Sequence, residues 1–147
     1  MSQTLAENRV VIRRQFGSKP EKIFDAWVNP EHLARWFGPT EGTRFPSLEV
    51  NAEPGGRYRI HMQSPDGKEW VVGGEYRRVE RPRFLEFTWA WEGADLGDSE
   101  TLVTVELNEI ETGTELVLTH SLFPTEEMCE NHDKGWNGSF ERLAKIV

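Results

Sequence analysis

From about residue 48 to residue 122, apolar and polar side chains alternate in short runs that turn signals separate. Successive side chains of a strand point to opposite faces. This period of two therefore predicts consecutive antiparallel strands with one covered face and one wet face. The run RYRIHMQ at 57–63 shows the pattern clearly, because Tyr58, Ile60 and Met62 share one side. We expect a curved antiparallel sheet over the middle of the chain.

A hairpin turn is predicted at 64–68, where SPDGK suits a type I turn with Gly67 in the left-handed region. Met62 then faces Trp70 across the hairpin, and Tyr76 follows on the same face. In the later strands, the same alternation places these residues on the covered face: Leu85, Phe87, Trp89, Trp91, Val103, Val105, Leu107, Leu116, Leu118, His120 and Leu122.

A first strand and two short helices precede these strands. The β-branched run at 8–16 predicts the strand, with its arginines on the wetter side. Ser18 and Glu21 have the spacing of a capping box, which predicts a helix over about residues 19–28. Asn29 and the proline that follows it predict the start of a second short helix.

The last predicted element is a helix of about 20 residues with Thr125 as its N-cap. Its apolar stripe follows spacings of three and four: Cys129, His132, Trp136, Phe140, Leu143 and Val147. Gly135 and Gly138 lie in mid-helix, where each costs about 1 kcal/mol relative to alanine. They either let the helix approach the sheet closely or leave space for another group. These elements predict one α+β domain over 1–147, in which about seven strands wrap a long C-terminal helix.

Length and charge narrow the class of protein. A chain of 147 residues is long enough to bury a core without metals or cross-links. Seventeen Lys and Arg against 25 Asp and Glu give a net charge of −8, which argues against a nucleic acid or an anionic membrane surface as partner. The first ten residues do not have the order of a signal peptide, and no apolar run is long enough to span a bilayer. With a single cysteine, Cys129, these features predict a cytoplasmic protein.

Four blocks of the sequence resemble, in order, those of a known superfamily. They are KPEKIFDAWVNPEHLARWFGP (19–39), AEPGGRYRIHMQSPDGKEW (52–70), GTELVLTHSLFP (113–124) and HDKGWNGSFERLAKI (132–146). The chain resembles the START-like (SRPBCC) helix-grip domains, and within them the bacterial homologues of the heat-shock protein 90 ATPase activator. This resemblance implies a seven-stranded sheet that grips a C-terminal helix, with two short helices after the first strand. It also implies a cavity between sheet and helix, which in that superfamily often takes lipids, steroids, polyketides or other apolar molecules.

His120 is the histidine that strand alternation places on the covered face. It has two interpretations: a neutral core histidine bonded to a neighbour, or a side chain that fixes the polar end of a ligand in the cavity. Burial lowers its pKa in either case, and the neutral form can also act as a general base. The sequence contains no metal-binding spacing of histidines and cysteines and no G-x-S-x-G motif. We expect no metal, no cofactor and no catalytic set.

Aromatic residues dominate the predicted interior. The candidates for the cavity wall are Trp36, Tyr58, Ile60, Met62, Trp70, Tyr76, Phe87, Trp89, His120, Trp136 and Phe140. Core packing explains each of them singly, but a core that needed only bulk would hold fewer polar-tipped rings. The leading hypothesis is the binding of a small hydrophobic or aromatic molecule. The alternatives are a protein-interaction module for a chaperone, implied by the family name, and a cyclase- or hydrolase-type enzyme that uses the same cavity.

Overall fold

The structure is a computed structural model that describes residues 8–93 and 100–147. Residues 1–7, part of the N-terminal stretch without signal-peptide character, lie outside the described residues. Within the described ranges, seven antiparallel strands form one sheet in the order β1-β7-β6-β5-β4-β3-β2. The strands are β1 (Val10–Phe16), β2 (Arg44–Val50), β3 (Arg57–Gln63), β4 (Glu69–Glu80), β5 (Phe84–Trp91), β6 (Thr101–Ile110) and β7 (Gly113–Ser121). The helices are α2 (Pro20–Val28), α3 (Pro30–Leu33) and α4 (Glu126–Leu143).

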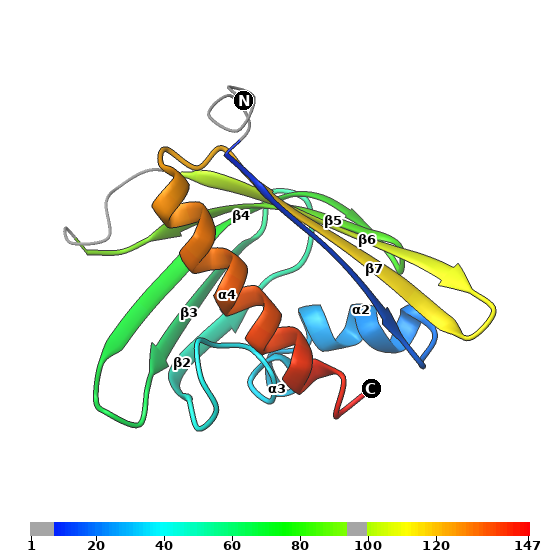
Figure 1. Ribbon diagram of the computed structural model, residues 1–147, viewed down its shortest axis with the longest axis horizontal. Helices are drawn as coiled ribbons and strands as arrows, with labels where there is room; N and C mark the ends of the chain where they lie inside the picture. The colour runs from blue at the N-terminus through cyan, green and yellow to red at the C-terminus, as the bar shows by residue number, and fades with distance from the viewer. Residues whose placement is uncertain (1–7, 94–99) are drawn as a thin grey trace.

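Helix α4 crosses the concave side of the curved sheet, and α2 and α3 lie near its C-terminal end (Figure 1). The helix begins where predicted, because the side chain of Thr125 accepts a hydrogen bond from the backbone N–H of Met128. The predicted α+β class and the gripping arrangement of sheet and helix are confirmed.

The register of the β3–β4 hairpin agrees with the prediction. Met62 pairs with Trp70, and farther along the hairpin Tyr58 pairs with Gly74. Gly67 has a φ of 90°, in the left-handed region that a glycine adopts without strain. One face of this hairpin therefore belongs to the interior, and this face positions the functional site described below.

The structure corrects three details. The predicted capping box is wrong: α2 has Lys19 as its N-cap with no side-chain cap, while the carbonyl of Ser18 accepts a hydrogen bond from Thr114 of β7. Arg14 is not on the wet side, since its parity turns it inward to donate to Asn137 of α4 at 3.1 Å. Leu122 is 66% exposed, because β7 ends before it and the backbone turns through a φ of 72°.

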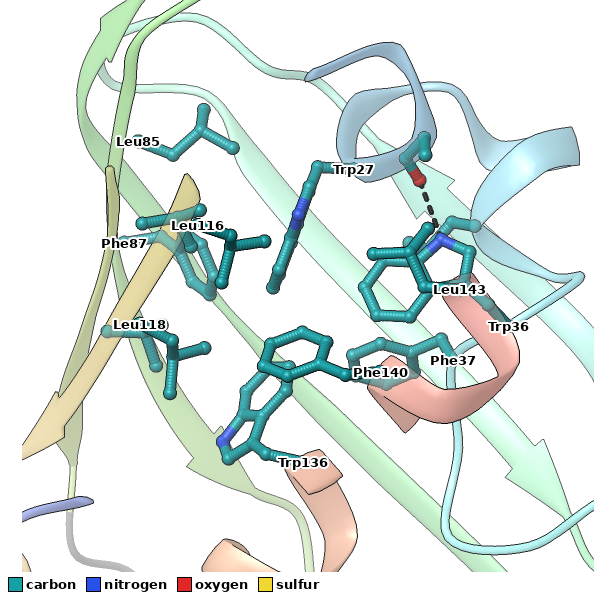
Figure 2. Packing of buried hydrophobic residues seen from close by; sticks show 14 of the residues in the cluster. Trp27, Trp36, Phe37, Leu85, Phe87, Leu116, Leu118, Trp136, Phe140 and Leu143 are labelled. Atoms are coloured by element: carbon teal, nitrogen blue, oxygen red, sulfur yellow. Dashed lines mark hydrogen bonds between the residues drawn. The ribbon is translucent and has the colours of Figure 1, made fainter. Parts of the chain in front are cut away.

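The core beneath the C-terminal half of α4 is closely packed. Trp27 and Trp36 meet edge to face with ring centroids 4.9 Å apart, and Phe140 lies 6.1 Å from the Trp27 ring. Figure 2 shows these rings together with Trp136, and the dashed line marks the bond from the Trp36 indole N–H to the carbonyl of Ala26 at 3.0 Å. Aromatic side chains from α2, the segment after α3 and α4 thus fill this half of the interior.

Candidate functional site

A cavity of about 590 Å³ lies between the N-terminal half of α4 and the sheet. The strands β3, β4 and β5, the segment after α3 and one face of α4 contribute its walls. The lining residues are Phe37, Gly38, Pro39, Met62, Trp70, Trp89, Trp91, Met128, Asn131, His132, Gly135, Trp136 and Ser139. Most of this wall is apolar, and the exposed side chains of Asn131 and Pro39 place its edge at the surface of the protein.

The two periodicities of the chain bring these residues together. On β5, Trp89 and Trp91 are two residues apart and therefore share the concave face. On α4, Met128, His132 and Gly135 follow spacings of four and three and therefore share the face toward the sheet. A Cβ atom built on Gly135 would meet no atom within 4 Å. Of the two predicted roles for this glycine, the structure favours the one that leaves space.

The side chain of His132 links helix α4 to the sheet at the cavity wall. Its Nδ1 lies 2.8 Å from the carbonyl oxygen of Met128, and the indole N–H of Trp91 donates to its Nε2 at 3.0 Å. Since Nε2 accepts a hydrogen bond, Nδ1 carries the ring hydrogen and donates a hydrogen bond to the carbonyl. Burial lowers the pKa of His132, while the bond to Met128 partly opposes that shift. Both nitrogens of a neutral ring are therefore engaged.

His120 lies behind this wall, with its ring 5.2 Å from that of Trp89. The indole N–H of Trp136 donates to its Nδ1 at 3.1 Å, and its Nε2 lies 2.7 Å from the hydroxyl of Thr101. That hydroxyl donates to the carbonyl of Trp89, so it accepts the Nε2–H of His120. Desolvation, and next the nearby His132, hold the pKa of His120 well below its usual value. The contacts are those of a neutral buried histidine whose hydrogen bonds are all made.

The predicted wall residues divide into two groups. Four of them line the cavity: Met62, Trp70, Trp89 and Trp136. Seven are buried but lie outside its lining: Trp36, Tyr58, Ile60, Tyr76, Phe87, His120 and Phe140. Tyr58 shows why a polar tip does not require a ligand, because its hydroxyl donates to the carbonyl of Thr88 at 2.6 Å. Desolvation raises the pKa of both Tyr58 and Tyr76. A binding role for any of these residues stays a prediction.

Several lining residues were absent from the predicted set. Strand alternation had already placed Trp91 on the covered face, and helical spacing had placed His132 on the stripe of α4. Met128 lies four residues before His132, at the same helical spacing. Gly38 and Pro39 lie in an irregular segment, where no periodicity tells which way a residue faces. Strand alternation and helical spacing therefore indicated the lining residues of the regular elements, but not those of the loop.

Within residues 8–93 and 100–147, no group of three or more His, Cys, Asp and Glu side chains is placed to hold a metal ion. None of the helices in those same ranges is both long enough and apolar enough to cross a membrane.

Comparison with known proteins gives one family and many similar folds. The family model described as Activator of Hsp90 ATPase homolog 1-like protein matches residues 18–147. The crystal structure of the AHSA1 protein from Silicibacter pomeroyi is 27% identical, with a TM-score of 0.83 over 93% of this chain and 95% of that one. A protein from Chromobacterium violaceum is 25% identical, with a TM-score of 0.82 over 95% of this chain and 97% of that one. None of the curated proteins matches.

Proposed function

This chain belongs to the Activator of Hsp90 ATPase homolog 1-like family, and from that premise we propose that it binds a small apolar or aromatic molecule in the cavity between α4 and the sheet. The family and its fold do not name the ligand, because one fold carries many functions. The class of molecule must therefore be inferred from the residues of the cavity wall.

The composition of the cavity wall is the observation that carries the proposal. Four tryptophans and two methionines line a space of about 590 Å³, which is in the usual range for small-molecule sites. Met62 and Met128 face it from sheet and helix, and methionine adapts readily to ligands of different shape. Large rings at the wall supply contact area to a planar or branched apolar molecule.

The space between α4 and the sheet also needs a reason. Apolar side chains that line a space open to the surface are not buried against other protein atoms, so the fold forgoes the stability that packing them would give. The same chain fills the other half of its interior with the rings of Trp27, Trp36 and Phe140. At position 135 the wall has a glycine although a larger side chain has room there. A ligand that occupies this space would explain the glycine.

The proposal is tested by titration with N-phenyl-1-naphthylamine, a neutral apolar probe, followed by its fluorescence. We expect Gly135→Leu to weaken binding at least about tenfold, because the added side chain enters the cavity. Gly138→Leu is the matched control: it lies on the same helix outside the lining, and it should bind as the wild type does. The proposal fails if the wild type does not bind the probe, or if both variants bind it equally well.

A chaperone partner is the second candidate, which the description of the family favours. The chain would then contact an Hsp90-type chaperone in the cytoplasm and raise the rate of its ATPase. Titration of the purified chain into such a chaperone, with ATP hydrolysis as the readout, tests this directly. An unchanged rate together with no detectable contact would remove the candidate. We propose no reaction for the cavity itself, because both nitrogens of His120 and of His132 are already hydrogen bonded.

A further inference from the structure

The cavity wall has no formal charge at neutral pH. Among the described residues that line it there is no Asp, Glu, Lys or Arg, and His132 is the one residue that can ionise near neutral pH. Arg142 lines a separate, smaller pocket, and its guanidinium donates to the carbonyls of Trp36 and Gly38. The charge of the described wall therefore depends on the state of His132.

An uncharged wall discriminates between ligands by their charge. A charged group that enters the cavity loses its water and meets no opposite charge there. A neutral donor such as the amide of Asn131 offers a hydrogen bond, but this does not replace the hydration of an ion. Tryptophan rings attract a cation, and that attraction is also smaller than the hydration that a buried cation loses. The wall thus favours a molecule whose enclosed part is uncharged.

The hydrogen bonds of His132 keep its ring neutral. The indole N–H of Trp91 donates to Nε2 at 3.0 Å, and Nδ1 donates to the carbonyl of Met128 at 2.8 Å. A proton added to Nε2 would point at the N–H of Trp91, so the ring cannot become charged without losing this hydrogen bond. Burial acts in the same direction and lowers the pKa of His132. Trp91 therefore opposes a positive charge at this position of the wall.

Aromatic rings surround His132 at centroid distances between 4.8 and 6.1 Å, and they are those of Trp89, Trp91, His120 and Phe123. His120 of β7 is the titratable member of this group, and desolvation keeps the pKa of its ring well below the usual value. Within three positions of His132 on α4, the ionisable residues are Cys129, Glu130, Asp133 and Lys134. The last three are exposed. Protonation of His132 would thus place a charge among buried rings.

We propose that the cavity is specific for uncharged molecules, and that the hydrogen bond from Trp91 maintains this specificity by keeping His132 neutral. This inference rests on the proposed binding function. It adds the charge class of the ligand and the residue that determines that class. An anionic or cationic amphiphile would bind only with its charged group left at the outer edge, beside the exposed Asn131 and Pro39.

The first test uses three probes of the same shape, the 2,6-dicarboxamide, the 2,6-dicarboxylate and the 2,6-dicarboxamidinium of naphthalene. Each probe has a polar group at both ends, so that one of the two groups must enter the cavity. Their affinities for the wild type are measured at pH 7.5 by displacement of N-phenyl-1-naphthylamine. We expect the uncharged diamide to bind at least about tenfold more tightly than either ion. The charge class is overturned if either ion displaces the dye as well as the diamide does.

The second test uses Trp91→Phe, which keeps an aromatic ring in the wall and removes the N–H that faces His132. The pKa of His132, measured by nuclear magnetic resonance, should rise. Between pH 7.5 and 6.0 the ratio of dianion to diamide affinity should rise at least about threefold more than in the wild type, because the wall gains a positive charge. An unchanged pKa of His132 in this variant overturns the role of Trp91.

Trp70→Phe is the matched control, since it changes another lining indole to a phenyl ring and leaves the bond between Trp91 and His132 in place. Whatever its effect on overall affinity, its ratio of dianion to diamide affinity should follow the pH dependence of the wild type. A ratio that follows Trp91→Phe instead would show that the loss of any lining indole has this effect, and it would overturn the role of Trp91.

Two further measurements use the wild type alone. Nitrogen-15 chemical shifts of the His132 ring at pH 7.5 should show a protonated Nδ1 and a bare Nε2, and a protonated Nε2 overturns the inference. Binding of N-phenyl-1-naphthylamine by itself separates the two proposals. If the wild type does not bind this dye, the proposed function fails and the inference fails with it. If the dye binds and the ions displace it as well as the diamide does, the charge specificity fails alone.

Discussion

The two halves of α4 face one sheet and differ in how their side chains are packed. Toward the C-terminus, Phe140 and Leu143 are completely buried. Toward the N-terminus, Met128, His132 and Gly135 are only half-buried and line the cavity. The same helix therefore belongs to a closed region at one end and an open region at the other.

The difference comes from what covers each half. The rings of Trp27 from α2 and Trp36 from the segment after α3 pack against Phe140 and fill the closed region. The open region has no such rings opposite Gly135, where a Cβ atom would meet nothing within 4 Å. We infer that the free energy of unfolding resides mainly in the closed region, which leaves the open region free to accept a ligand. The predictions below test that separation, beginning with the largest effect.

The largest contrast is expected between two truncations on α4. Phe140→Ala removes a completely buried ring from the closed region and should lower the free energy of unfolding by about 3–5 kcal/mol. Met128→Ala removes a half-buried side chain at the cavity and should cost only about 1 kcal/mol. Denaturant unfolding followed by circular dichroism measures both. Equal losses would show that the two halves of the helix do not differ in this way.

A smaller effect is expected from pH, since the two regions meet at the buried histidines. Desolvation keeps the pKa of His120 well below its ordinary value of about 6.5, and burial lowers that of His132 as well. The unfolded chain therefore binds more protons than the folded chain below about pH 6.5. Stability should be constant above pH 7 and fall as the pH drops toward 5.5. The slope is at most about 1.4 kcal/mol per pH unit for each histidine.

His120→Leu separates the contributions of the two histidines. The variant should be less stable at every pH, since the indole N–H of Trp136 loses its acceptor. Its stability should nevertheless depend less on pH between 7 and 5.5, because only His132 still titrates with a lowered pKa. Denaturation midpoints at pH 7.5, 6.5 and 5.5 measure this. A slope as steep as that of the wild type would show that His120 is not the residue responsible.

Periodicity predicted most of the fold because this sheet has one buried face and one exposed face. A register error of one residue would have exposed Tyr58, Ile60 and Met62, so the alternation leaves only one workable pairing. The errors occurred where a contact with a distant part of the chain overrode a local sequence rule. Ser18 has the sequence spacing of a helix N-cap, but its carbonyl accepts a hydrogen bond from Thr114, which lies 96 residues away in sequence.

The candidate site was harder to predict, because a period tells which face a residue lies on and not what opposes it. Phe140 and Trp89 both point inward, yet Phe140 meets the rings of Trp27 and Trp36 while Trp89 reaches the cavity. That difference depends on how α2 and α3 dock against the sheet. Similarly, alternation placed His120 inside correctly, but only the structure shows that Thr101 and Trp136 occupy both its nitrogens.

The smallest predicted effect concerns the two mid-helix glycines of α4, Gly135 and Gly138. Alanine is the better helix former, and each Gly→Ala change should raise the free energy of unfolding by about 0.5–1 kcal/mol. Neither site resists a methyl group: Gly135 has no neighbour within 4 Å, and Gly138 has only the end of the Arg142 side chain at 3.8 Å. Denaturant unfolding of both variants measures the gain. A gain at Gly138 without one at Gly135 would mean that the space beside Gly135 is already filled by protein in solution, and the helix would then have no open half.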